Sequence, residues 1–204
     1  MTRQLIRSSL GSALTLAAAL AAGASLTAQS SPLALDSATI TIAGTSNVHD
    51  YTATTTKVTL TRVEIGAVAG DTFWDDVQKA GGLQAFDITI PAESLKSSKD
   101  GLDKNMYKAL KTKEHANITF SLKSLTGTPG ALTATGTLTV AGVAREVTLP
   151  LKTVKKGDKL AVSGTVDVMM PDHGIAPPKA MMGMVKAHPK ITVSFEVLLG
   201  LVTT

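Results

Sequence analysis

The chain has 204 residues, no cysteine and a formal net charge of +4, from 20 lysine and arginine residues against 16 aspartate and glutamate residues. Without cysteine no disulfide can hold the fold, so stability must come from the burial of apolar side chains and from backbone pairing. Positive and negative residues are well mixed, and no basic run of the kind that grips nucleic acid occurs, which argues against a nucleic-acid-binding protein.

The N-terminus has the residue order of an export signal. Arg3 and Arg7 precede an apolar stretch over residues 10–22, and small residues follow it. This order predicts a secretory signal peptide over residues 1–28, with cleavage near residue 24 or 28. The apolar stretch is shorter than the roughly 20 residues that span a bilayer. We therefore expect residues 29–204 to form one domain, located in the bacterial periplasm or secreted.

Apolar and polar residues alternate through most of the remaining chain, which predicts β-strands with one buried face. In chain order these strands occupy residues 38–44, 51–65, 85–91, 117–122, 132–140, 147–151, 160–168 and 191–199. The second is long enough to contain a β-bulge. Two segments, residues 72–80 and 102–111, have helical patterns instead. Many short strands with hairpin-length connections predict an all-β fold, here an eight-stranded antiparallel β-barrel with one or two short helices.

The predicted inner face carries small residues at Ala134, Gly136 and Gly164, and aromatic residues make up only 3% of the chain. A barrel of eight strands is just wide enough to be filled by its own side chains or to hold one small ligand. A lining of small and β-branched residues favours a cavity. The alternative is that the small residues make room for larger side chains, so that the core is filled.

Four segments, read in order, resemble the YceI-like family of periplasmic, lipocalin-like barrels that bind polyisoprenoid lipids. They are residues 45–51, residues 88–97 with the following 106–111 and 115–120, residues 134–147, and residues 172–175 with the closing strand that ends at Phe195. The chain departs from the family pattern at residues 115–117, where an aromatic residue followed by proline is common, and at residues 70–82, an added helical excursion. These departures leave the identity of the ligand open.

The resemblance implies a lipocalin-like barrel that carries or stores a polyisoprenoid or a similar long-chain lipid, with no cofactor and no catalytic residue. Burial of apolar ligand surface, at roughly 25 cal/mol per Å², would drive binding. The residues expected to line the cavity are Phe86, Ile88, Ile90, Phe120, Leu138, Val166, Val168, Met170, Met181, Met182 and Phe195.

Five of the seven methionines lie between residues 169 and 184. Because methionine is flexible and polarisable, they are expected to form a pliable lip at the mouth of the barrel, or else to cap one end of the core. Together with His173 and His188 they also suit copper, particularly Cu(I), so a copper-binding periplasmic protein is an alternative. Adjacent side chains such as Met181 and Met182 point apart, however, and give no chelating geometry.

Lys104, Lys108 and Lys111 recur at helical spacing. At the mouth of the barrel they would attract a phosphorylated head group or an anionic membrane surface; the alternative is an ordinary solvated helix face. His49, in the turn after the first strand, would hydrogen-bond a head group or cap the turn.

No nucleophile, histidine and carboxylate form a readable catalytic group, so the chain is not expected to be an enzyme. A structural or interaction barrel with a filled core is a further alternative, and a homodimer formed through the mouth stays open.

Overall fold

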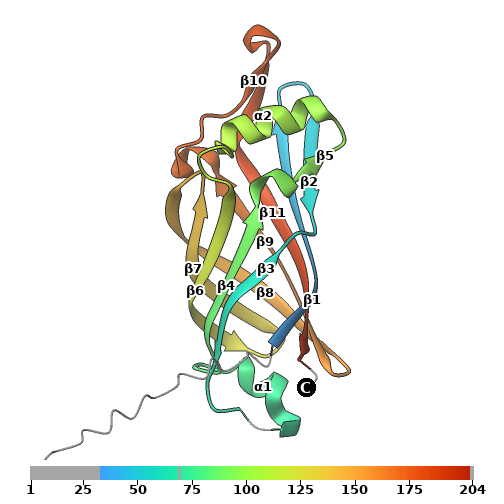
Figure 1. Ribbon diagram of the computed structural model, residues 1–204, viewed down its shortest axis with the longest axis vertical. Coiled ribbons are helices and arrows are strands. Elements are labelled where there is room, and N and C mark those ends of the chain that lie inside the picture. Colours follow the sequence, from blue (N-terminus) through green and yellow to red (C-terminus); the bar gives the residue numbers. More distant parts are fainter. Residues whose placement is uncertain (1–32, 69, 203–204) are drawn as a thin grey trace, which may run out of the picture. The chain divides into compact units, whose positions relative to one another are not determined.

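The computed structural model describes residues 33–68 and 70–202, and the predicted signal peptide lies outside this part of the chain. Eleven β-strands form one antiparallel sheet that curls around an interior, with one α-helix at each end (Figure 1). None of the helices among the described residues is long and apolar enough to span a membrane.

The strands lie at β1 (Leu33–Ser46), β2 (Asp50–Thr55), β3 (Thr59–Ile65), β4 (Leu83–Pro91), β5 (Lys96–Ser97), β6 (Asn117–Thr128), β7 (Ala131–Val140), β8 (Val143–Lys156), β9 (Lys159–Met169), β10 (Lys179–Ala180) and β11 (Val185–Leu201). The helices are α1 (Phe73–Val77) and α2 (Asp100–Leu110). Short 3-10 turns occupy Gly70–Thr72, Ala92–Ser94, Met170–His173 and Met181–Gly183.

The sheet order is β3-β4-β6-β7-β8-β9-β11-β1-β2-β5, and β10 pairs with β11. The predicted all-β antiparallel fold is confirmed, but the predicted count of eight strands is not matched. The segment predicted as one strand over residues 51–65 is interrupted at residues 56–58, which divides it into β2 and β3. The chain of β4 likewise continues through a 3-10 turn into β5. The halves still pair across this interruption, β2 with β5 and β3 with β4, and the short β10 adds one more strand.

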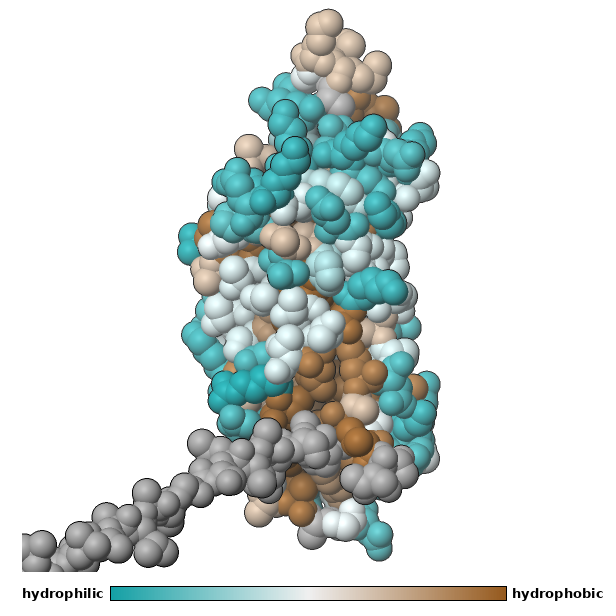
Figure 2. Space-filling model, in the orientation of Figure 1, coloured by the Kyte–Doolittle hydropathy of each residue, from teal (hydrophilic) through white to brown (hydrophobic). Residues whose placement is uncertain are grey.

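The first half of β1 lies beside β3 without a backbone ladder. β1 pairs with β2 only from Ile40 to Thr45, whereas it pairs with β11 along nearly its whole length. Among the described residues, side chains rather than hydrogen bonds join β1 to β3 there: Leu35, Val63 and Ile65 pack into the same apolar cluster. Figure 2 shows hydrophobic side chains gathered over this lower half of the curled sheet.

Helix α1 closes one end of the curled sheet (Figure 1). Trp74 and Val77 are buried against Leu33, Leu160 and Leu199. The indole N–H of Trp74 donates to the carbonyl of Asp158 at 2.9 Å, so the buried ring has its polar atom satisfied. The predicted helix over residues 72–80 is therefore present in a shorter form, and it acts as an apolar plug.

Two of the small residues on the inner face each lie against one large aromatic ring. A side chain on Gly136 would overlap the ring of Phe120, and one on Gly164 would overlap the ring of Phe195. At these two positions, glycine makes room for a phenylalanine from the neighbouring strand. A cavity is nevertheless present beside these rings.

Replacing Trp74 with alanine should lower the free energy of unfolding by about 3–5 kcal/mol, because it removes a buried ring and leaves the Asp158 carbonyl without its donor. Urea denaturation followed by circular dichroism measures this. Asp75→Ala, an exposed change in the same helix, is the control and should cost much less. A loss at Trp74 no larger than at Asp75 would contradict the plug.

Candidate functional site

The interior of the curled sheet holds an apolar cavity of about 220 Å³. Only three of its lining residues carry a polar side chain: Gln78, Thr119 and Thr153. Two of these satisfy each other at the α1 end, where the hydroxyl of Thr153 donates to Oε1 of Gln78 at 2.5 Å and accepts from the N–H of Gly130 at 2.8 Å. The cavity therefore offers a ligand an almost purely hydrocarbon wall.

Eight of the residues predicted to line a cavity do line it. They come from β4, β6, β7, β9 and β11, because alternate side chains of each strand point to the same face. These residues are Phe86, Ile88, Ile90, Phe120, Leu138, Val166, Val168 and Phe195. Their contact with a ligand stays a prediction.

A second compartment of about 160 Å³ adjoins the first beneath α2, and Ile42, Ile118 and Val168 line both. We call it the end compartment. Helix α2 contributes Met106 and Leu110 to it from its apolar face. Its polar lining includes Ser46, His49, Tyr51, Thr52, Ser97, Asn105, His173 and Lys179. Residues with polar side chains are thus gathered at this end of the interior, although the wall of the compartment is still mainly apolar.

Tyr51 places a phenol in the end compartment. It pairs with Gly44 across the β1–β2 ladder, and its ring occupies the space that a side chain on Gly44 would need. Burial raises the pKa of Tyr51, so the hydroxyl stays protonated and can donate. No role for Tyr51 was predicted from the sequence. Its period-two spacing from Ala53, which also lines this compartment, was the available signal.

His173 and Met170 are buried in the 3-10 turn that follows β9, and both line the end compartment. The ring nitrogen Nδ1 of His173 lies 3.0 Å from the carbonyl oxygen of Val143. Because a carbonyl only accepts, Nδ1 carries the proton and donates. Met170, which was predicted to line the cavity, lines this compartment and not the main cavity.

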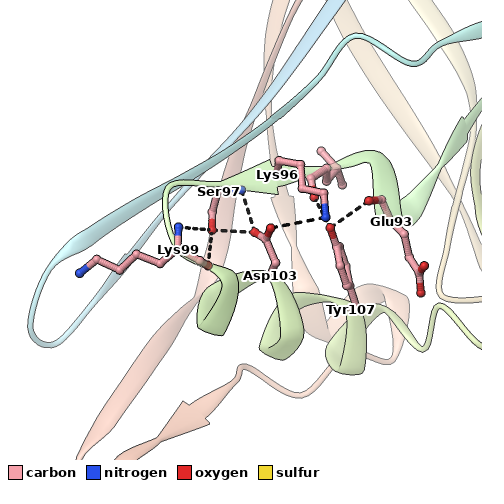
Figure 3. Close-up of polar contacts among 7 residues, drawn as sticks. Glu93, Lys96, Ser97, Lys99, Asp103 and Tyr107 are labelled. Carbon is pink, nitrogen blue, oxygen red and sulfur yellow. Dashed lines mark hydrogen bonds and ion pairs between the residues drawn. The ribbon is translucent and has the colours of Figure 1, made fainter.

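Hydrogen bonds centred on Asp103 attach α2 to β5 (Figure 3). The hydroxyl and the backbone N–H of Ser97 both donate to Oδ1 of Asp103 at 2.7 Å. Nζ of Lys96 lies 3.7 Å from Oδ2, and 5.0 Å from the centre of the Tyr107 ring. The hydroxyl of Tyr107 in turn lies 2.7 Å from the carbonyl of Leu95. The Ser97 hydrogen bonds, with a smaller contribution from Lys96, hold the pKa of Asp103 below its usual value.

The remaining predicted site residues lie away from the cavities, apart from His49. Lys104, Lys108 and Lys111 are exposed, because the opposite face of α2 packs inward. Met181 and Met182, expected in the lining, are 68% and 100% exposed in the turn between β10 and β11. No group of three His, Asp or Glu side chains able to hold a metal occurs within residues 33–68 and 70–202.

A family model described as the YceI-like domain matches residues 27–198 of the chain. No curated protein sequence matches the chain. Among solved structures, Burkholderia cenocepacia BcnA has a TM-score of 0.63 at 14% sequence identity, and the match covers 79% of this chain and 95% of that one.

Two other solved structures are also similar. A polyisoprenoid binding domain from Saccharophagus degradans, implicated in plant cell wall breakdown, has a TM-score of 0.61 at 12% identity, with 83% of this chain and 98% of that chain covered. The Campylobacter jejuni YCEI protein has a TM-score of 0.55 at 18% identity, with 72% and 82% covered. At these identities the likeness shows a shared fold.

Replacing Asp103 with asparagine should loosen α2, because Oδ1 exchanges a charge-assisted acceptor for a weaker neutral one. The carboxylate stabilises the native protein at any pH above its ordinary unfolded pKa of about 3.9. This contribution disappears as the pH falls through the lowered native pKa of Asp103.

Hydrogen exchange of the α2 amides at pH 7 should therefore be faster in Asp103→Asn than in the unmodified chain. Urea midpoints measured from pH 7 down to pH 3 should converge for the two proteins as the pH falls. Glu114→Gln, an exposed change just after α2, serves as the control. Equal exchange rates in Asp103→Asn and the unmodified protein would refute the role of Asp103.

Proposed function

Because the chain belongs to the YceI-like family, we propose that it carries or stores a polyisoprenoid or a similar long-chain apolar lipid inside the curled sheet. The family match confirms the resemblance predicted from the sequence. The observation that carries the proposal is the main cavity, whose wall is hydrocarbon except for three polar side chains. The description of the Saccharophagus degradans neighbour as a polyisoprenoid binding domain supports the same ligand class.

The dimensions of the interior suit a slender chain. Leu160 and Val168, near the two ends of β9, both line the main cavity, and eight residues of strand extend about 26 Å. The two compartments together reach the lower part of the roughly 300–1,000 Å³ that small-molecule sites occupy. Burial contributes roughly 25 cal/mol per Å² of apolar ligand surface, so affinity should grow with chain length until the interior is full.

The head group is proposed to lie in the end compartment, beside Tyr51, His49 and His173. These side chains provide hydrogen-bond donors and acceptors, and Lys179 adds one positive charge to the same lining. The lysines of α2, expected to attract a phosphorylated head group, lie outside this compartment. The arrangement thus suits a polar head group that carries at most a single negative charge.

The proposed role is binding, not catalysis, and its proposed location is the periplasm or the cell exterior. The location rests on the signal-peptide pattern of residues 1–28, with its two arginines, apolar stretch and small residues.

Mass spectrometry under non-denaturing conditions tests the proposal directly. The mature protein is purified from an exporting bacterial host and measured intact, and then again after organic extraction. A stoichiometric extractable species with isoprene-unit mass spacing is expected. A ligand-free mass that persists when prenyl lipids are offered would overturn the proposal and favour a non-carrier barrel.

Replacing Val166 with tryptophan should abolish or shorten the bound lipid, because the indole would occupy the main cavity midway along β9. The neighbouring Thr165 is exposed on the outer face, so Thr165→Trp is the matched control and should bind as the unmodified protein does. Titration with prenyl alcohols of increasing length, read by native mass spectrometry, compares the two. Equal lipid occupancy in both variants would place the lipid outside the cavity.

A further inference from the structure

The hairpin formed by β10 and β11 projects beyond α2 (Figure 1), and the turn at its end carries exposed methionines. Met181, Met182 and Met184 are 68%, 100% and 67% exposed, and Val48 in the neighbouring β1–β2 turn is 64% exposed. We call these four residues the methionine tip. In Figure 2 the end of this hairpin is a pale brown cap above a band of hydrophilic side chains. Large apolar side chains held this far out gain nothing from the fold itself.

The backbone of the tip is also unfavourable for its residues. Met181 and Met182 have φ angles of +49° and +55°, and Gly183 follows at +88°. Turns of this kind favour glycine, asparagine or aspartate, since other side chains crowd the backbone in the left-handed region. Methionine at two such positions is costly both in conformation and in exposure, which is consistent with an intermolecular role.

The hairpin is held in place by the β1–β2 turn. The side-chain amide of Asn47 donates to the carbonyl of Met184 at 2.8 Å, and its Oδ1 accepts from the N–H of Lys186 at 2.7 Å. The backbone N–H of Asn47 also donates to the carbonyl of Lys186 at 3.1 Å. The two loops therefore present their apolar side chains as one unit.

A pair of lysines stands at the base of the tip. Lys179 and Lys186 lie directly opposite each other in the β10–β11 ladder. Both are exposed, and neither forms an ion pair with any residue in the described part of the chain. Like charges in this position repel each other, and an anion between or beside them removes the repulsion.

We propose that the methionine tip inserts into an anionic lipid bilayer, with Lys179 and Lys186 at the level of the phosphates. Flexible thioether side chains adapt to disordered acyl chains, and lysine stems extend along the interface while their amines stay in the polar layer. The narrow convex tip fits a fluid surface better than a protein interface, which needs upwards of about 1,000 Å² of complementary area. Because Lys179 and Val185 also line the end compartment, docking would bring that compartment to the membrane.

Vesicle flotation of the purified mature protein tests the docking independently of any cargo. Vesicles of phosphatidylcholine with about 30% phosphatidylglycerol, which have an anionic surface, are compared with vesicles of phosphatidylcholine alone. The unmodified protein should float with the anionic vesicles. Met181→Asn with Met182→Asn keeps residues that tolerate the left-handed turn, and should lower the partition coefficient at least tenfold.

The charge contribution has its own variant and control. Lys179→Gln with Lys186→Gln should lower binding to the anionic vesicles about 30-fold, as expected for two lysines near such a surface, and should change binding to neutral vesicles little. Val154→Ser removes another exposed apolar side chain, on β8 away from the tip, and should behave as the unmodified protein does. Thermal unfolding midpoints confirm that each variant is folded.

Equal flotation of the unmodified protein and the methionine variant would overturn the proposal, as would failure to float with either kind of vesicle. Concentration-dependent self-association that the methionine variant abolishes, without vesicle binding, would instead assign the tip to a second copy of the chain. The lipid-carrier function can fail its own test by mass spectrometry while the tip still binds vesicles, so the two outcomes are distinguishable.

Discussion

The pairing of backbone polar groups within a curled antiparallel sheet determines what its interior can contain. Except where the first half of β1 lies beside β3, the strands use their N–H and C=O groups in ladders with their neighbours. The inner face is therefore formed by side chains. Strict alternation makes those side chains apolar, and the few polar ones near α1 bond to one another, as Gln78 and Thr153 do. The main cavity therefore has almost no group that could orient a polar molecule. Binding there would be driven by the burial of apolar ligand surface.

A curled sheet has two open ends, and the chain closes them with different interactions. At the α1 end, Trp74 and Val77 are buried in an apolar cluster, whose strength depends on excluding water. At the α2 end, Met106 and Leu110 contribute apolar contacts, but the attachment to β5 is made by the Asp103 carboxylate and its Ser97 donors. Water can replace hydrogen bonds of this kind more readily than it can replace apolar packing. The polar groups of the interior gather at this second end.

The strands and the cavity wall were predictable from the sequence because a period of two is a local property. Val166 and Phe195 face inward for the same reason that their neighbours Thr165 and Glu196 face outward. The break at residues 56–58 was not predictable, since the residues on both sides have similar strand-forming composition. It arises where the chain stops pairing with β1 and begins to pair with β4, which depends on tertiary structure.

The sequence also did not predict where the α2 lysines and the methionines lie relative to the curled sheet. Helical spacing correctly placed Lys104 and Lys108 on one face of α2, but only packing shows that the face with Met106 points inward. The cluster of methionines between residues 169 and 184 suggested one lip. In the folded chain it divides, because Met170 stays beneath α2 while the β10–β11 hairpin carries Met181 and Met182 away from the sheet.

The two departures from the family pattern that the sequence suggests have different consequences for the proposed ligand. His115 places its ring over Gly142 in the β7–β8 turn, where a side chain on Gly142 would overlap it. Neither residue lines the main cavity or the end compartment, so this change leaves both walls unaltered. The helical excursion over residues 70–82 is different, because it supplies the α1 plug and places Gln78 in the wall of the main cavity. Because this plug is part of the chain, it fixes the depth of the interior. In a hydrocarbon cavity, depth is the property that discriminates between ligands of different length. Each further methylene adds to the binding free energy only where the cavity has room to bury it.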